Sequence, residues 1–309
     1  MDLLTLSIAP LIAASINAGT PLMLAALGLL INEKSGVVNL GAEGMMLVAA
    51  IVGFAITVNT GSVTFGFIAG AAAGMLLAGF FALMTVWLGT NQYATGLALS
   101  LFGAGTSAYI GISYVGNSLQ NEKSGIPFLA DIPFLGTALF KQHPMVYLAV
   151  VLCGAIIWFL YHTRAGLILR AVGESPSSAH SLGYNVRRIR LAALLFGGAC
   201  CGLAGAFLSL VYTPLWVEGM VAGRGWIALA LTTFATWRPA RVLSGAYLFG
   251  GVTILTFHIQ GLGVPIASQL LSMLPYIATI VVLVLISRNA NWIKLNMPAS
   301  LGKNFNPNK

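Results

Sequence analysis

Long apolar segments restrict this chain of 309 residues more than any other feature. A transmembrane helix needs about 20 mainly apolar residues. Only 7% of the residues are charged, whereas a soluble domain carries about 25%, so a polar shell cannot cover these segments. They lie at 3–31, 45–58, 63–88, 94–115, 144–161, 191–212, 226–236, 243–259 and 266–287. We therefore expect a protein that crosses the membrane many times.

The apolar runs are continuous, whereas the strands of membrane barrels alternate apolar and polar residues. Backbone groups in lipid must be hydrogen-bonded within the chain, so helices remain as the expected structure. We predict an all-α polytopic membrane protein with about 8–10 transmembrane helices. Segments 45–58 and 226–236 are too short for a full span and predict broken or re-entrant helices. Pro10 and Pro21 leave open whether the first segment is one kinked helix or two pieces.

Basic residues concentrate in loops, as the positive-inside rule describes for cytoplasmic segments. Five arginines stand against Glu174 in residues 162–190, and the end of the chain carries lysines without acids. We expect a membrane domain over 1–290, in which loop 162–190 is cytoplasmic, and a cytoplasmic tail over 291–309. The large outer loop is expected at 116–143. The net charge of +8 then reflects topology and does not indicate binding to nucleic acid.

Residues for catalysis, metal binding or nucleotide binding do not form a recognisable set. The four histidines and three cysteines lack ligand spacing, and no phosphate-binding loop of the G-x-x-x-x-G-K-[ST] type occurs. The sequence therefore predicts no cofactor and no enzymatic activity in this chain. Five apolar segments contain no charged residue, which disfavours an ion-coupled transporter. An intramembrane enzyme is disfavoured as well, because it would need a set of catalytic residues and the sequence shows none.

Polar residues between the first two apolar segments are candidates for function. We expect Glu33 and Lys34 to lie in a solvated inner turn. A carboxylate near the bilayer is costly and is usually paired or functional, so the sequence allows two roles for Glu43, a structural hydrogen bond or a place beside the solute path. We predict that four residues lie near this path: Asn39, Glu43, Asn91 and Gln92. The alternative for the last two is that they merely terminate helices at the inner surface.

The basic loop contains the signals of a short helix. Ser175 is a suitable N-cap, Pro176 suits the first helical position, and Gly183 is a suitable stop. A helix from Pro176 to Leu182 would be about 10 Å long. Its small side chains on a cytoplasmic loop favour docking to another protein. The predicted docking residues are Glu174, Ser175, Pro176, Ser177, Ser178, Ala179, Leu182 and Gly183.

Small residues also recur at four-residue spacing in two apolar segments. They are Gly66, Gly70, Gly74 and Ala78 in one segment, and Gly198, Gly202 and Ala206 in another. Such stripes allow the backbones of membrane helices to approach closely. Packing between helices of the same chain is the favoured interpretation, and a dimer face is the alternative.

Four stretches resemble the branched-chain-type permease family of ABC importers, in its nucleoside and simple-sugar branch. They are Thr20–Leu22 with Glu33–Met46, Leu169–Arg187, Ala222–Ala230 and Trp237–Pro239. The resemblance implies ATP and Mg²⁺ on partner ATPase subunits, a second and non-identical permease, and an extracytoplasmic solute-binding lipoprotein. It places the chain in the inner membrane of a prokaryote, surrounded by lipid, as an importer of nucleosides. Simple sugars, purines and riboflavin are alternative solutes.

Overall fold

The computed structural model describes residues 3–120, 134–261 and 296–306, with isolated positions between 125 and 132 and between 270 and 284. The predicted outer loop and the last apolar segment lie partly outside these residues. The described part is built from helices and contains no β-strand, so the all-α prediction is confirmed. The α-helices are α1 (Leu3–Lys34), α2 (Ala42–Thr60), α3 (Val63–Ala82), α4 (Gln92–Gly111), α5 (Pro144–His162), α6 (Arg164–Glu174), α7 (Pro176–Ser181), α8 (Val186–Phe207), α9 (Arg224–Phe234) and α10 (Pro239–Gly261).

Seven helices in the described residues are long and apolar enough to cross a membrane. Two of them are lengthened by π-helical turns, since α3 continues through Leu83–Trp87 and α8 through Leu208–Tyr212. The first apolar segment is one helix, although Pro10 and Pro21 lie inside it.

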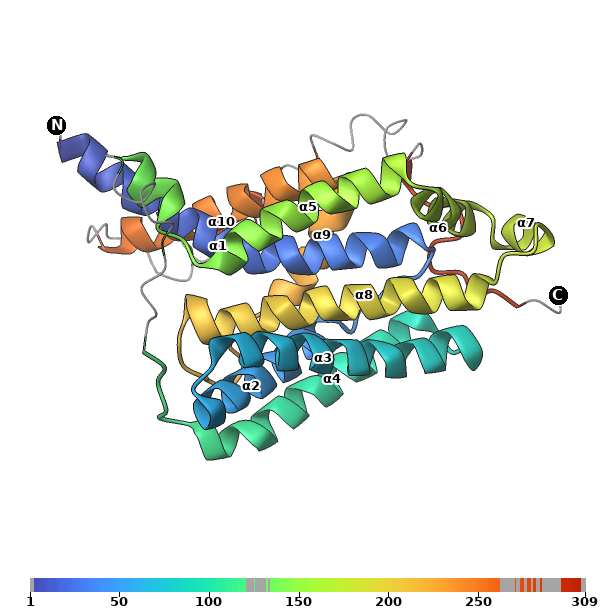
Figure 1. Ribbon diagram of the computed structural model, residues 1–309, viewed down its shortest axis with the longest axis horizontal. Helices are drawn as coiled ribbons and strands as arrows, with labels where there is room; N and C mark the ends of the chain where they lie inside the picture. Colours follow the sequence, from blue (N-terminus) through green and yellow to red (C-terminus); the bar gives the residue numbers. More distant parts are fainter. Residues whose placement is uncertain are drawn as a thin grey trace.

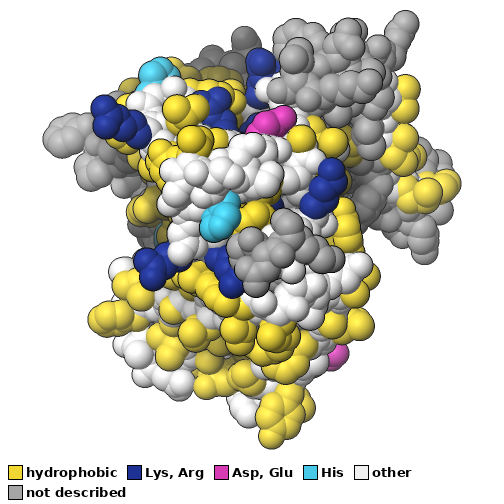
Figure 2. Space-filling model, turned by 90° about the vertical axis from the view of Figure 1, so that its right-hand side faces the viewer, with side chains coloured by type: hydrophobic (Ala, Val, Ile, Leu, Met, Phe, Trp, Pro, Cys, Tyr) yellow, Lys and Arg dark blue, Asp and Glu magenta, His cyan; other side chains and the backbone are white. Residues whose placement is uncertain are grey.

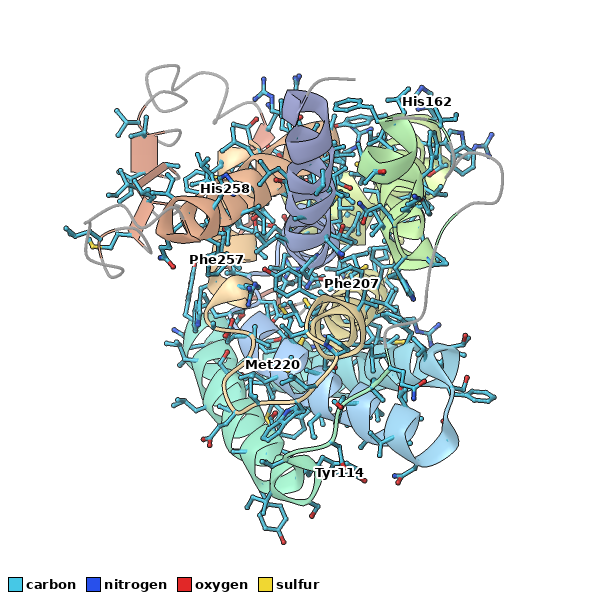
Figure 3. The ribbon with its side chains drawn as sticks, turned by 90° about the vertical axis from the view of Figure 1, so that its left-hand side faces the viewer. Tyr114, His162, Phe207, Met220, Phe257 and His258 are labelled. Carbon is cyan, nitrogen blue, oxygen red and sulfur yellow. The ribbon has the colours of Figure 1, made fainter. Side chains whose placement is uncertain are left out.

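The long helices run along one axis, and α6 and α7 project at one end of the molecule (Figure 1). We call this end the α7 end, and the other the opposite end. Helix α1 is central and mostly buried, with α8 beside it. Seen from the opposite end, α1 lies between α10, marked by His258, and α5, marked by His162 (Figure 3).

The two stripes of small residues pack against each other, in the seam between α3 and α8. A Cβ atom added to Gly70 would come within 2.7 Å of the Ala206 side chain, and Gly74 has even less space against Gly198. Close backbone approach of this kind contributes van der Waals packing in lipid. The packing interpretation is therefore confirmed, and the dimer-face alternative is wrong for these stripes.

The second helix is longer than the sequence pattern indicated. We expected a short segment at 45–58, but α2 has 19 residues and includes Glu43 in its first turn. Gly44 lies inside α2, where this helix crosses α4 closely. A Cβ atom on Gly103 would come within 2.5 Å of the Gly44 Cα atom. In contrast, α9 has only 11 residues, as expected for a broken element.

Candidate functional site

The stretch from Val37 to Gly41 connects α1 and α2 and runs beside the first turns of α4. The Gln92 side-chain carbonyl accepts a hydrogen bond from the Val38 amide over 2.9 Å, at the start of α4. The close approach of Gly44 to Gly103 lies 11 residues further along α4, about 16 Å at 1.5 Å per residue. Helix α2 therefore starts deep within the helical bundle, and Glu43 lies at that depth.

The Glu43 carboxylate caps the N-terminus of α9. Its Oε1 atom accepts the Gly223 amide over 2.8 Å, and its Oε2 atom accepts the Gly225 amide over 2.7 Å. Gly223 is the N-cap residue and has no side chain that could satisfy these amides. A Cβ atom on Gly225 would come within 2.6 Å of the Glu43 backbone. A carboxylate at a helix N-terminus is also favoured by the helix dipole.

A second carboxylate holds the other end of α9. Glu33 is 3% exposed, and its Oε2 atom accepts a hydrogen bond from the indole nitrogen of Trp237. The Thr232 hydroxyl lies 3.1 Å from the same oxygen. The expectation of a solvated inner turn was therefore wrong for Glu33, because donors from α9 and the turn that follows it cover its carboxylate. It was also wrong for Lys34, which is buried and donates to the Asn296 carbonyl. Helix α9 is held between two acids that belong to α1 and α2.

Backbone strain accompanies both ends of α9. Three residues other than glycine have positive φ angles there: Ala222 at 51°, Thr236 at 49° and Trp237 at 53°. Such conformations cost of order 1–3 kcal/mol each and persist when the surroundings hold them. The hydrogen bonds of Glu43 and Glu33 are among the contacts that hold these turns, together with a bond from Arg241 to the Thr236 hydroxyl.

A cavity of about 260 Å³ lies between α1, α9 and α10, beside the N-terminus of α9. Its aromatic lining is Phe249 and Phe257, and its polar lining includes Arg224, Thr253, Thr256 and Gln260. The Arg224 guanidinium donates to the Met220 and Val221 carbonyls and lies over the Tyr212 ring. The described lining therefore offers aromatic surface, hydroxyls, an amide and a guanidinium, and no carboxylate.

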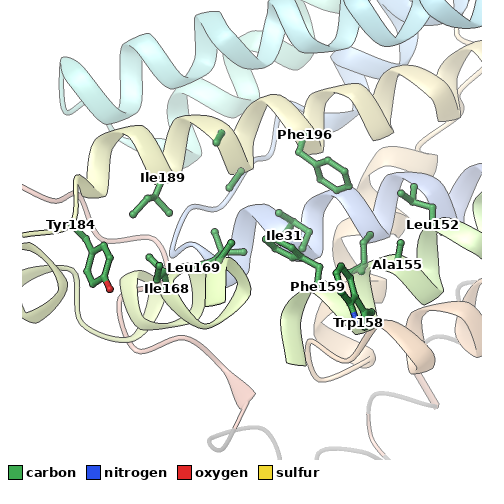
Figure 4. Close-up of a pocket in the computed structure, with 14 residues that line it drawn as sticks. Ile31, Leu152, Ala155, Trp158, Phe159, Ile168, Leu169, Tyr184, Ile189 and Phe196 are labelled. Atoms are coloured by element: carbon green, nitrogen blue, oxygen red, sulfur yellow. The ribbon is translucent and has the colours of Figure 1, made fainter. Parts of the chain in front are cut away.

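A second cavity, of about 660 Å³, has a different character. Figure 4 shows its apolar side chains, which come from α1, α5, α6 and α8. Trp158 and Phe196 are partly exposed at its edge. A polar solute would lose its hydrogen bonds to water there without replacement, so this cavity is a poor candidate for a solute site. It lies between α5, α6 and the first half of α8.

Helix α7 has the predicted N-terminal cap. Ser175 accepts the Ser178 amide at 3.3 Å, Pro176 is the first helical residue, and Gly183 follows with a φ of 89°. The helix ends at Ser181, one residue earlier than expected. Figure 2 looks onto the α7 end, where Lys and Arg side chains gather around an uncharged patch.

The side chains of α7 do not all face outward. Ser177, Ser178 and Leu182 are exposed, and Leu182 reaches 78%. Ala179 is 3% exposed and packs with Val172. We expected Ala179 to contact a partner, but it faces the protein's own interior because α7 folds back on α6 and α8.

The four predicted path residues occupy three different places. Asn39 is buried and its side chain accepts the Gly41 amide. Asn91 is exposed and caps α4 by accepting the Tyr93 and Ala94 amides. Gln92 accepts a hydrogen bond from the connecting stretch. Of the four residues, only Glu43 lies at the depth of the N-terminus of α9. These contacts are structural, and a role in solute movement stays a prediction.

Sequence reasoning missed the partners of Glu33 and Glu43. The donors at Glu43 are backbone amides about 180 residues further along the chain. Every residue except proline has a backbone amide, so residue type does not show which amides act as donors. The two flanking glycines, Gly223 and Gly225, were the available signal. They permit the positive φ at the N-cap and the close approach to α2.

Comparison with known proteins gives a consistent result. Residues 11–286 match the family model for the branched-chain amino acid transport system permease component. The chain is 39% identical to a Haloferax volcanii protein that carries the name of a glucose ABC transporter permease, over 96% of this chain and 98% of that protein. It is 31% identical to a nucleoside ABC transporter permease of Lactococcus lactis, over 89% and 91% of the two chains.

A guanosine ABC transporter permease of Bacillus subtilis is 29% identical, over 88% of this chain and 90% of that protein. No solved structure matches the chain.

Proposed function

The chain belongs to the branched-chain amino acid transport permease family, and from this we propose that it imports a neutral, hydroxyl-bearing solute such as a nucleoside or a simple sugar. It is the multi-pass membrane subunit of an ABC importer of a prokaryotic inner membrane, and ATP is hydrolysed by a partner subunit. The relatives named for guanosine, nucleosides and glucose support this solute class.

The observation that carries the proposal is the occupied N-terminus of α9. In many transporters the N-terminus of a broken helix attracts an anionic group of the substrate. Here the Glu43 carboxylate already accepts the amides of Gly223 and Gly225. A second carboxylate or a phosphate would be repelled by Glu43 and would find the amides of Gly223 and Gly225 already occupied. This argues against amino acids and nucleotides, and in favour of neutral solutes.

The cavity beside α9 supplies groups that suit such a solute. Phe249 and Phe257 offer aromatic surface for a base or a sugar ring. Thr253, Thr256 and Gln260 offer hydrogen-bonding groups for hydroxyls and ring nitrogens. We place the path along this cavity, with Glu43 at its edge, while Asn39, Asn91 and Gln92 hold the connecting stretch that leads to Glu43. Purines and riboflavin remain alternative neutral solutes.

The α7 end would face the cytoplasm and dock on the ATPase. Its excess of basic residues supports this orientation, which also places the C-terminal tail inside the cell. The exposed Ser177, Ser178 and Leu182 would form the docking face, and Glu174 to Gly183 would be the coupling element. A second, non-identical permease and an extracytoplasmic solute-binding lipoprotein would complete the importer. A cysteine at Ser178 should resist an impermeant thiol reagent in intact cells; efficient labelling would reverse the orientation.

Competition for uptake tests the solute class. Cells that depend on this importer would take up labelled guanosine or glucose, with unlabelled guanosine, glucose, guanosine monophosphate and leucine as competitors. We expect one of the neutral solutes to compete, and neither leucine nor the monophosphate to do so. Competition by leucine or the monophosphate alone would refute the charge argument. Uptake that continues without any ATPase partner and stops with an uncoupler would favour an ion-coupled transporter.

A further inference from the structure

The described part of the C-terminal tail, residues 296–306, lies across the α7 end (Figure 1). We call it the strap. It begins near α1, where the Lys34 ammonium group donates to the Asn296 carbonyl over 2.8 Å. Further along, the Gly302 amide donates to the Gly36 carbonyl over 3.1 Å. The strap is therefore bonded to the start of the stretch that connects α1 with α2.

The strap also holds the end of α6. Ser300 donates twice to the Gly173 carbonyl, from its amide over 3.1 Å and from its hydroxyl over 2.6 Å. Gly173 has no space for a side chain, because Lys34 and Gly36 lie against it. The last turn of α6, the connecting stretch and the strap thus meet at one point.

A buried arginine of α8 depends on the strap. Arg190 is 2% exposed. Its guanidinium donates to the Lys303 carbonyl over 3.1 Å, to the Ser300 hydroxyl over 3.3 Å and to the Ser35 carbonyl over 3.2 Å. These acceptors are uncharged, and two of the three belong to the strap. A buried charge without hydrogen bonds is very unfavourable, so Arg190 stabilises the strap in place.

On one side the strap reaches the connecting stretch through α4. The Asn304 side chain donates to the carbonyls of Gly89 and Thr90 over 2.6 and 3.0 Å, and its Oδ1 atom accepts from Gln92 over 3.1 Å. Gln92 in turn accepts the Val38 amide. A continuous chain of hydrogen bonds thus runs from the strap to the residues that lead to Glu43.

On the other side the strap reaches α7. The Phe305 ring packs against the small cluster of Val172, Ala179 and Val186. It also meets the His180 ring edge to face, with 5.6 Å between the ring centroids. The strap is therefore in contact with the coupling helix and with the connecting stretch at the same time, at the end where the large apolar cavity lies between α6 and α8.

We propose that the strap transmits movement of α7 to the Val37–Gly41 stretch, and through it to Glu43 and α9, with Phe305 and Asn304 as positioning residues. This proposal rests on the docking of α7 to the ATPase described above. The two residues act on opposite halves of the connection, since Phe305 contacts α7 and Asn304 contacts α4. Loss of either side chain should uncouple ATP hydrolysis from transport and leave the docking face unchanged.

The test uses the complete importer in proteoliposomes, with Phe305→Ala and Asn304→Ala. We expect normal co-purification of the ATPase, ATP hydrolysis within about twofold of wild type, and about a fivefold or larger fall in solute imported per ATP, the lower range of allosteric coupling. Lys303→Gln is the matched control. Its side chain is exposed and its backbone bond to Arg190 is kept, so it should couple normally.

Unchanged import per ATP in both variants would overturn the proposal. Failure of both variants to assemble with the ATPase, while Lys303→Gln assembles, would also overturn it and leave the strap a purely structural element. Failure of the wild-type chain to bind any ATPase would instead refute the proposed function.

Discussion

Replacement of Glu43 by alanine is the most direct test of how α9 is held. The substitution removes the acceptors of the Gly223 and Gly225 amides, at a site that is partly buried. A hydrogen bond to a charged group contributes about 1.5–3 kcal/mol. The two bonds share one carboxylate and are not independent, so we take about 3 kcal/mol for the pair. That energy changes the ratio of docked to undocked α9 by roughly a hundredfold.

We expect Glu43→Ala to lower the initial rate of solute uptake about tenfold or more, and to lower the thermal unfolding midpoint of the purified subunit. Glu43→Gln should fall between alanine and wild type. Its amide oxygen can accept one amide hydrogen, but its NH2 group would face the other donor.

Glu218→Ala is the control, since Glu218 is an exposed carboxylate in the loop that leads to α9. Uptake is measured in cells with matched amounts of each variant in the membrane. Wild-type uptake together with a wild-type unfolding midpoint in Glu43→Ala would show that α9 does not depend on this carboxylate, and the argument for neutral solutes would lose its basis.

Three further predictions concern other parts of the molecule. Gly74→Val should strongly reduce the yield of folded protein in size-exclusion chromatography, because α3 and α8 would have to separate; Gly79→Val on the same helix has space and should be tolerated. Leu182→Arg should abolish co-purification of the ATPase without reducing expression, and normal co-purification would remove α7 from the docking face. Trp237→Phe removes a donor from buried Glu33 and should destabilise the subunit by about 1.5–3 kcal/mol. Adding Glu33→Gln should then cost less than the two single losses combined, whereas simple additivity would contradict their contact.

The sequence predicted the elements whose signals are local. Apolar runs longer than a bilayer predicted the spanning helices, and Ser175 with Pro176 predicted the start of α7. The glycine stripes predicted a close helix pair, although the partner of each stripe could not be read from its own segment. In each of these cases the residues that carry the signal lie within one element.

The remaining features depend on distant partners. The role of Glu43 was left open between two alternatives, since no neighbouring residue in the sequence shows that the N-terminus of α9 lies at the same depth in the helical bundle. The tail was expected to be a separate cytoplasmic segment, and Ser300, Asn304 and Phe305 form no periodic pattern that would indicate packing. Their contacts join residues more than 100 positions apart, and single-sequence patterns carry no information at that range.

The capping of α9 by Glu43 also sets a condition on how the protein is made. The donors at Gly223 and Gly225 follow Glu43 by 180 and 182 residues. At a synthesis rate of about 5–20 residues per second, the ribosome needs roughly 10 to 40 s to reach them. During that interval the start of α2 carries a carboxylate without its final partners, and full insertion of that turn into lipid would be costly. The first turn of α2 should therefore reach its final depth only after α9 has been synthesised, so that one of the first helices to be made is among the last to be completed.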